Sequence, residues 1–298
     1  MIQLIVPYVA GGGSDQRARL VARHMARHLG EDIQAVNRTG AVAGHEAIAA
    51  APADGSVIGL ITGEIGMMHW HQGLTKLTPA DYTPLAVPYV ESAAVIVAGN
   101  SPWRSIADFV DEMKRRPLRG SGGPNFGVWK FALIGLMDAL GIDASHLEWT
   151  ETLSGEQGLE NVLAGRADVA PITMTDARAK LFSGEARALV TMEDARHARF
   201  PGVPTVSEAL GVKWHVAHWR GIVAPKDLAG SVANRYIAAL RSTSQDAAFA
   251  EEAAASAFTV RWRFGRDFGT YMDEDDEQFG HVIRLLKRGQ SNFLVTKG

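Results

Sequence analysis

The regular alternation of strand-like and helix-like segments at the start of the chain is the feature that most constrains its fold. Residues 2–9 are apolar and β-branched, which predicts a buried strand, and apolar residues recur at helical spacing over residues 18–29. Two more strands are expected at residues 33–36 and 57–61, with a short alanine-rich helix at residues 43–51. This order is typical of parallel strands joined by right-handed crossovers. The sequence therefore predicts an α/β domain with a mostly parallel sheet flanked by helices.

A second set of similar segments predicts a second α/β domain. It comprises strands at residues 93–97 and 168–172 and helices at residues 105–115, at residues 126–140 and after Ser154, before a largely helical C-terminal stretch. The 298 residues, 46% of them hydrophobic, are enough for two cores of ordinary size. We expect the chain to return to its first domain. One lobe would then comprise residues 1–98 and 223–298, and the other residues 99–222.

The overall composition excludes several classes of protein. The net charge of −3 and the lack of a long basic run argue against nucleic-acid binding, which needs a concentrated basic surface. The absence of cysteine excludes disulfides and thiolate metal sites. No segment approaches the roughly 20 consecutive apolar residues of a transmembrane helix, so we expect no insertion into a membrane. Met1 leads directly into the first strand, so we expect no signal peptide within this sequence.

Three turns are placed where α/β proteins bind ligands, beyond the carboxyl ends of strands. Residues 11–13 are glycines between the first strand and a helix, with Ser14 at the expected helix N-cap and Asp15 in its first turn. Residues 120–125 form a second glycine-rich segment, and Ser154 and Gly155 precede a third helix. Helix starts present unpaired N–H groups and favour an anion. Each turn could equally be only a tight connection, and Asp15 could serve only its own helix.

Enzyme and metal motifs are mostly missing. The P-loop, GxGxxG and GxSxG patterns do not occur, and His45-Glu46 fails as a zinc motif because position 49 is alanine. His24 and His28 are flanked by arginines, which favours a solvated basic face over a metal site. The run His69-Trp70-His71 allows either metal binding or a role in lining a site. The residue pattern thus predicts no cofactor and no metal.

Several segments together resemble the Bug receptors of tripartite tricarboxylate transporters. The likeness spans nearly the whole chain in six ordered motifs: residues 5–15 (IVPYVAGGGSD) with Arg19, residues 36–41 (VNRTGA) with Gly44, Asp54-Gly55, residues 81–85 (DYTPL), residues 201–209 (PGVPTVSEA) and residues 219–225 (WRGIVAP). Each motif is modest alone, but their combination in this order is specific.

The resemblance implies a periplasmic receptor, not an enzyme, with the two-lobed periplasmic-binding-protein (Venus flytrap) fold. Such a receptor would hold a small dicarboxylate, keto acid or aromatic acid between its lobes, after removal of a leader, and deliver it to the permease subunits of a transporter. We expect it to be a monomer. The implied ligand-binding residues are Tyr8, Ala10, Gly11, Gly12, Gly13, Ser14, Asp15, Thr62, Gly63, Gly122, Gly123, Asn125, Phe126, Ser154, Gly155 and Asp176.

The sequence departs from the family pattern in two places. Residues 66–71 (GMMHWH) lack an Asn-Pro pair, and residues 148–155 (EWTETLSG) stand where the family has a Val-Pro-Tyr-Lys-Gly motif. Phe126 and Trp129 could line an apolar part of the site or belong to a helix core. Two alternatives also remain: a two-domain enzyme acting on an organic acid through Asp176, Glu64 or His69, and a sensory module that uses the same lobes.

Overall fold

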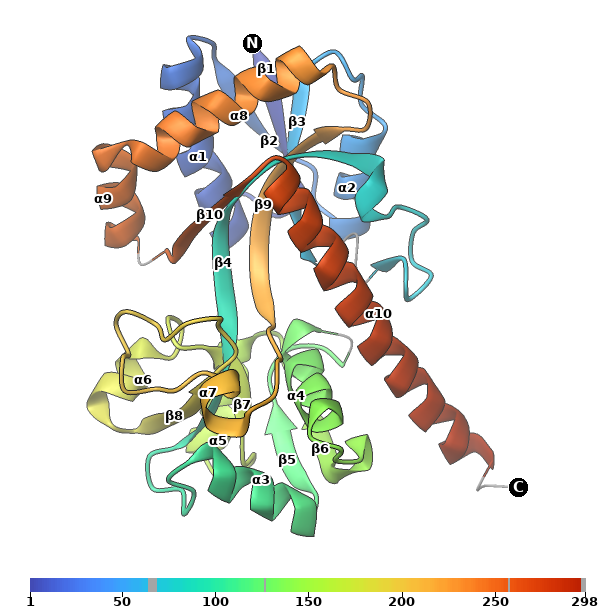
Figure 1. Cartoon of the computed structure of the whole chain (residues 1–298), viewed down its shortest axis with the longest axis vertical. Coiled ribbons are helices and arrows are strands. Elements are labelled where there is room, and N and C mark those ends of the chain that lie inside the picture. The colour runs from blue at the N-terminus through green and yellow to red at the C-terminus, as the bar shows by residue number, and fades with distance from the viewer. Residues whose placement is uncertain (64–68, 126, 257, 296–298) are drawn as a thin grey trace. The chain divides into compact units, whose positions relative to one another are not determined.

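The computed structural model describes residues 1–63, 69–125, 127–256 and 258–295. The chain forms two compact units, one made of Met1–Val90 and Trp219–Gly280, the other of Glu91–His218 and His281–Gly298. Each unit contains strands and helices, as expected for an α/β protein (Figure 1). The lobe boundaries expected after residues 98 and 222 stay a prediction.

The first unit is built on one mixed sheet with the strand order β10-β4-β9-β3-β1-β2. Strand β1 pairs in parallel with β2 and β3, whereas β9 is antiparallel to β3 and β10 is antiparallel to β4. The sheet is thus mixed and not mostly parallel, because the two strands contributed by the later part of the chain enter in the opposite direction. Its strands are β1 (Ile2–Val6), β2 (Ile33–Asn37), β3 (Val57–Thr62), β4 (Tyr82–Ala98), β9 (Ala217–Pro225) and β10 (Val260–Phe264).

Helices cover this sheet because their apolar residues recur on one side. In α1 (Gly13–Leu29), the side chains of Ala18, Val21 and Met25 are buried in a core shared with α8 (Gly230–Gln245) and α9 (Ala247–Ala255). Helix α2 (Ala41–Ala49) packs against β1 and β3, and η2 (Pro79–Asp81) precedes β4. The long helix α10 (Arg266–Val295) starts in the first unit and ends in the second. Gly30 ends α1 in the left-handed conformation, as its position predicts.

The second unit has smaller sheets around the continuation of β4. Strands β7 (Ala170–Thr173) and β8 (Ala186–Thr191) are antiparallel to β4, while β5 (Leu118–Ser121) and β6 (Leu147–Thr150) form a parallel pair. Ser105 caps the first helix through a capping box, as expected. The helical segments are α3 (Ile106–Arg115), α4 (Val128–Ala139), η3 (Ala144–His146), α5 (Gly155–Leu163), α6 (Arg178–Ser183) and α7 (Val206–Leu210).

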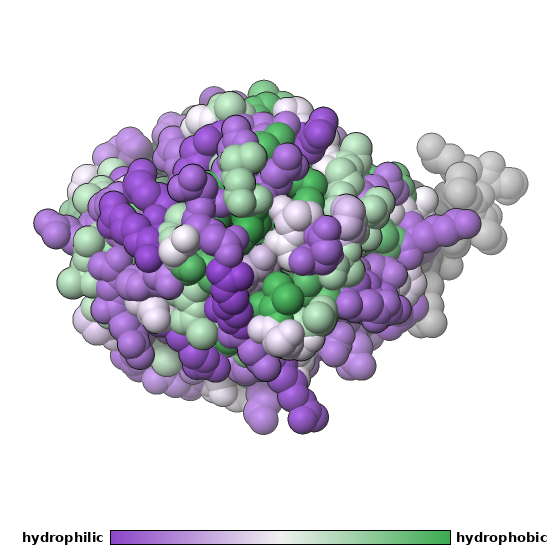
Figure 2. All heavy atoms as spheres, turned by 90° about the horizontal axis from the view of Figure 1, so that it is seen from above, coloured by the Kyte–Doolittle hydropathy of each residue, from purple (hydrophilic) through white to green (hydrophobic). Residues whose placement is uncertain are grey.

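The face shown in Figure 2 is largely polar, and its hydrophobic residues form small, separate patches. Among the described residues, large exposed apolar side chains are Met1, Val9, Leu74, Leu153 and Phe182. Within the same residues, no helix has the length and apolar character needed to cross a membrane.

Candidate functional site

The loop between β1 and α1 presents backbone N–H groups at a helix start. Gly11 has a φ of 78°, which glycine adopts readily. Gly12 is the N-cap of α1, so no capping side chain occupies the helix start. The first intrahelical hydrogen bond runs from the Gln16 N–H to the Gly12 carbonyl at 2.9 Å. Ser14 therefore lies in the first turn and is not the N-cap that the sequence predicts. The helix begins earlier than expected, and a helix start carries the N–H groups that favour an anion.

Asp15 holds this loop in shape. Its side chain is 3% exposed, and its carboxylate accepts hydrogen bonds from Gly11 N–H at 2.8 Å, from Arg19 Nε at 2.9 Å and from Asn37 Nδ2 at 2.8 Å. Asn37 Nδ2 also donates to the Tyr8 carbonyl at 2.9 Å. Burial opposes ionisation, but the hydrogen bonds from Arg19, Gly11 and Asn37 outweigh it and lower the pKa of Asp15. Asp15 thus positions the loop with a charge that Arg19 neutralises.

Polar side chains from strands β3 and β9 and from the β1–α1 loop meet beside the start of α1. The Tyr8 hydroxyl and Thr62 Oγ1 lie 2.9 Å apart, and Arg220 Nε donates to the Ser14 hydroxyl at 3.0 Å. Arg220 is 8% exposed and stands opposite Thr62 in the β3–β9 ladder. The structure thereby brings the predicted residues Tyr8, Ser14 and Thr62 together around a buried cation.

The sequence pattern did not identify Arg220 as a ligand-binding residue. Arg220 was recognised only as a member of the motif at residues 219–225. The available signal was its place inside an otherwise apolar strand, since a charged side chain is buried only when it is paired or functional. Its contact with Ser14 joins residues 206 positions apart, which the sequence alone does not reveal.

Gly63 lets the end of β3 approach the interior closely. A Cβ atom at Gly63 would lie 3.1 Å from Trp219 Nε1 and 3.2 Å from Asp275 Oδ2. Trp219 Nε1 donates to Asp275 Oδ2 at 2.6 Å. Burial raises the pKa of Asp275 to about 8, and the neighbouring Asp276 adds to the shift, while the Trp219 hydrogen bond opposes it. At neutral pH the side chain of Asp275 next to the predicted site residue Gly63 is therefore an uncharged carboxylic acid.

In the second unit, two of the predicted loops come together. Gly123 N–H donates to Thr152 Oγ1 at 2.7 Å, and Asn125 N–H donates to Glu151 Oε1 at 2.6 Å. Ser154 caps α5 by accepting from Gln157 N–H. A Cβ at Gly158 would overlap with the Ser121 carbonyl and lie 2.6 Å from Gly122 Cα, so glycine is needed for α5 to pack there. A surface hollow of about 470 Å³ lies nearby, lined by Pro124, Glu151, Thr152, Leu153 and Gln157.

Trp129 and Asp176 lie next to these loops. A Cβ at Gly123 would be 3.3 Å from Trp129 Cδ1, and one at Gly155 would be 3.1 Å from Trp129 Nε1, so the ring borders both loops. Asp176 Oδ2 accepts from Thr173 Oγ1 at 2.7 Å in the turn after β7. Phe126 and Glu64 lie outside the described residues. Ala10 is an exposed residue of the β1–α1 loop.

Trp70 and His71 both contact Asp276 of α10. Trp70 Nε1 donates to Asp276 Oδ1 at 2.8 Å, and His71 Nε2 lies 3.1 Å from the same oxygen, with the two rings stacked. Among the described residues, no group of three or more potential ligands could hold a metal ion.

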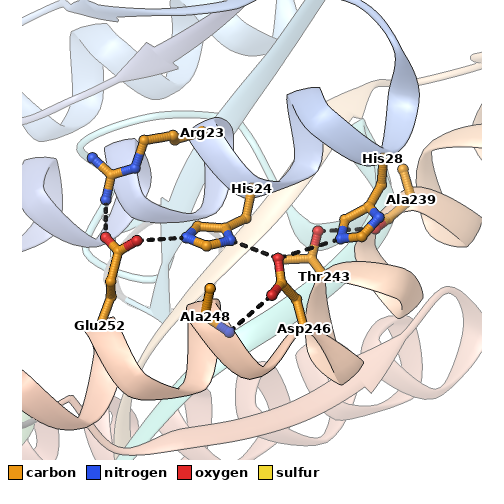
Figure 3. Close-up of polar contacts among 8 residues, drawn as sticks. All are labelled: Arg23, His24, His28, Ala239, Thr243, Asp246, Ala248 and Glu252. Carbon is orange, nitrogen blue, oxygen red and sulfur yellow. Dashed lines mark hydrogen bonds and ion pairs between the residues drawn. The ribbon is translucent and has the colours of Figure 1, made fainter.

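The expectation of a solvated basic face was wrong for His24. Its side chain is fully buried, with Nδ1 2.8 Å from Asp246 and Nε2 3.1 Å from Glu252 (Figure 3). Those carboxylates come from more than 200 residues later in the chain. The arginines on either side of His24 and His28 therefore did not indicate the surroundings of His24.

Two α/β units with glycine-rich helix starts, one beside a buried arginine, define a solute-binding protein. A model of the tripartite tricarboxylate transporter family receptor matches residues 17–287, and the chain belongs to that family. It is a receptor and not an enzyme, so the alternative of an organic-acid enzyme is not retained.

Individual relatives agree with this assignment. Protein BugT of Bordetella pertussis is 28% identical over 283 residues, which cover 85% of this chain and 80% of BugT. The crystal structure of a TctC solute-binding protein from Polaromonas has a TM-score of 0.89 and 24% identity, with 95% of this chain and 97% of that chain covered. MatC from Rhodopseudomonas palustris, with bound malate, has a TM-score of 0.72 and 20% identity, covering 95% and 98%. These two structures support the two-domain binding-protein fold.

Proposed function

We propose that this receptor binds a small organic carboxylate at the start of α1. The observation that carries the proposal is Arg220, a buried cation that donates to Ser14 and stands opposite Thr62. A carboxylate there would accept hydrogen bonds from the first-turn amides of α1 and from the guanidinium group. The hydroxyls of Tyr8 and Thr62 would complete its surroundings.

The magnitudes are sufficient for a useful affinity. A helix start contributes about 0.3–1 kcal/mol to an anion, and up to about 2 kcal/mol when partly buried. Each charge-assisted hydrogen bond adds about 1.5–3 kcal/mol. Micromolar binding requires about 8 kcal/mol. One helix start and three such bonds reach that value, so no covalent or metal-assisted contact is needed.

The second unit supplies its own candidate contacts. Gly122, Gly123, Asn125, Ser154, Gly155 and Asp176 stay proposed ligand-binding residues, with Trp129 beside them as an added apolar wall. The ligand class is a dicarboxylate, keto acid or aromatic acid, and malate in MatC is one example from a protein of similar fold. We further propose that the receptor acts in the periplasm as a monomer and delivers its ligand to the permease subunits of a tripartite tricarboxylate transporter.

Thermal unfolding in the presence of malate, succinate, 2-oxoglutarate, adipate and benzoate tests the binding function. An acid that binds only the folded state raises the melting temperature as its concentration increases. We expect at least one of these acids to do so. If none shifts the melting temperature at millimolar concentration, the proposed ligand class is wrong.

Replacing Arg220 tests the site itself. We expect Arg220→Met to weaken binding of the stabilising acid by about 10- to 100-fold, which corresponds to one lost charge-assisted hydrogen bond or slightly more. The matched control is Arg266→Met, which removes an exposed arginine at the start of α10. Calorimetry on both variants, with melting curves to confirm folding, gives the comparison. Equal affinities would show that the carboxylate binds elsewhere.

A further inference from the structure

A groove of about 960 Å³ lies between helix α1 and strand β2 of the first unit. The helix and the strand lie side by side (Figure 1). One wall of the groove is the face of α1 from Arg19 to Gly30, and the other is formed by residues 31–35. We call it the α1–β2 groove. None of the residues that line it belongs to the proposed carboxylate site, so its shape calls for a separate explanation.

Strand β2 leaves one edge of its backbone open. It is the last strand of its sheet and pairs with β1. The Asp32 carbonyl and the Arg38 N–H each bond to β1 at 2.8 Å, and alternate residues of a strand bond to opposite sides. The backbone groups of Ile33, Ala35 and Asn37 therefore point to the open edge, where no other described residue bonds to them. Such an edge is a template for a further strand.

Three arginines form a row on the helix wall of this groove. Arg19, Arg23 and Arg27 follow one another at four-residue intervals, so they are about 6 Å apart along the axis of α1. The small residues Ala22 and Ala26 lie among them. In an extended strand, side chains that face the same way are about 6.6–6.8 Å apart. A strand lying in the groove would thus present its side chains at nearly the spacing of the arginines.

The charge of this row is only partly neutralised. Arg23 pairs with Glu252, but both side chains are about half exposed, and surface pairs of this kind are weak. Arg27 is exposed and has no ion-pair partner among the residues that the structure describes. Glu31 and Asp32 line the end of the groove that follows α1, and Glu31 is already in an ion pair. The helix wall is therefore basic and suits an acidic occupant.

We propose that the α1–β2 groove binds an extended, acidic segment of a partner protein. The segment adds a strand to the open edge of β2, and every second side chain is a carboxylate that faces Arg23 and Arg27. A small free anion would use only the arginines and would leave the strand edge unpaired. The inference goes beyond the proposed function and does not depend on it, because none of these groups is assigned to the carboxylate ligand.

Short capped peptides of alternating glutamate and threonine test the charge requirement. The control peptide alternates glutamine and threonine. Binding of the fluorescently labelled peptides to the whole chain is measured by anisotropy. We expect the acidic peptide to bind about 3- to 10-fold more tightly than the control, and added salt to narrow the difference. No binding of the acidic peptide at millimolar protein concentration would overturn the inference.

Methylation of the peptide backbone separates strand pairing from charge attraction. Because alternate N–H groups of a strand point to opposite edges, methylating the glutamate nitrogens blocks one edge of the peptide and methylating the threonine nitrogens blocks the other. We expect one methylated peptide to bind about 10-fold more weakly or worse, and the other to bind like the parent peptide. Equal affinities of the two methylated peptides would show that no strand is added.

Hydrogen exchange of the protein amides locates the peptide. With the acidic peptide bound, the N–H groups of Ile33, Ala35 and Asn37 should exchange more slowly. Those of Gln34 and Val36 already bond to β1 and should change little. Unchanged exchange at the three outward amides would place the peptide elsewhere and overturn the inference.

Arg27→Glu tests the arginine row. The matched control is Arg115→Glu, because Arg115 is also exposed and also lies in the last turn of its helix, α3. We expect Arg27→Glu to bind the acidic peptide about 3- to 10-fold more weakly, with the glutamine peptide unaffected and the control variant like the wild type. Melting curves confirm folding. Equal affinity of Arg27→Glu and the wild type for the acidic peptide would overturn the inference, whereas binding of small acids, which tests the proposed function, should be the same in all three proteins.

Discussion

Asp275 shows how one buried side chain can connect the stability of this receptor to pH. In the folded chain its pKa is raised from 3.8 to about 8, chiefly by burial. Between these values the unfolded chain has lost the proton and the folded chain has kept it. Linkage then makes the free energy of unfolding fall as pH rises through this window and level off above it.

Asp275→Asn should remove this dependence. The Asn side chain keeps an oxygen that accepts from Trp219 Nε1 and has no proton to lose. We expect the variant to gain stability relative to the wild type between pH 6.5 and pH 8, by more than about 1 kcal/mol for each pH unit of window removed. Urea unfolding at several pH values measures it, and Asp273→Asn, an exposed change on the same helix, is the control. If the free energy of unfolding of Asp275→Asn and of the wild type changed with pH in the same way, Asp275 would not be the group that titrates.

Gly221 is a second residue that controls stability, because the packing around it leaves no room for a side chain. A Cβ there would overlap with the ring of Phe268, which is fully buried. Gly221→Ala should therefore lower the free energy of unfolding by about 1–3 kcal/mol or more through overpacking. Gly202 has open space around its Cβ position, so Gly202→Ala should leave stability within about 1 kcal/mol of the wild type. Denaturant unfolding measures the stability of both variants. Equal losses of stability in Gly221→Ala and Gly202→Ala would contradict the overpacking at Gly221.

At the scale of elements, a polar cluster fastens α1 to α9. Asp246 is the N-cap of α9, accepting from Ala248 N–H at 2.9 Å, and it also bonds His24 of α1 at 2.8 Å (Figure 3). The His24 hydrogen bond chiefly lowers the pKa of Asp246 to about 2. Since its folded pKa is depressed, Asp246 stabilises the fold above pH 3.8, and this contribution is lost as pH falls toward 2.

Asp246→Asn should remove the negative charge at this position and keep the helix cap, because Asn also caps helices well. We expect the variant to melt several degrees below the wild type at pH 7 and to approach it near pH 2.5, where the wild-type carboxylate is becoming protonated. Asp32→Asn, an exposed change in the same unit, is the control. A melting difference that stays constant with pH would mean that the ionised form of Asp246 does not contribute.

These elements also show what the sequence could predict. Helix α1 and its end at Gly30 were predicted from the local spacing of apolar residues. The loop at residues 11–15 was predicted from its position after a strand. The first half of β4 was missed, because Pro84 and Pro88 interrupt its apolar pattern and its pairing with β10 joins distant segments. Arg220 and the partners of His24 were missed for the same reason: their contacts join residues more than 200 positions apart.

At the scale of the whole molecule, three kinds of titratable group set the pH range of stability. Asp15 and Asp246 have lowered pKa values, so they stabilise the fold above about pH 4 and this is lost in acid. Asp275 acts in the opposite direction up to about pH 8. His45 has a pKa well below 6.5, so the unfolded chain takes up a proton there and the folded chain does not. Stability therefore rises with pH through the His45 window.

On the acid side of pH 6.5 the proton that folded Asp275 keeps and the proton that folded His45 does not take up have opposite effects, so the free energy of unfolding should form a plateau there. Above pH 6.5 His45 no longer contributes, and the raised pKa of Asp275 should make stability decline toward pH 8. Removing one group should tilt the plateau: with His45→Phe, stability should keep increasing as pH falls from 6.5 to 4, whereas Asp275→Asn should extend the high-stability range to pH 8. Urea unfolding from pH 3 to pH 9 measures all three profiles. A wild-type profile that rises steadily from pH 4 to pH 8 would contradict this balance, because it would require Asp275 to be ionised while buried against Trp219.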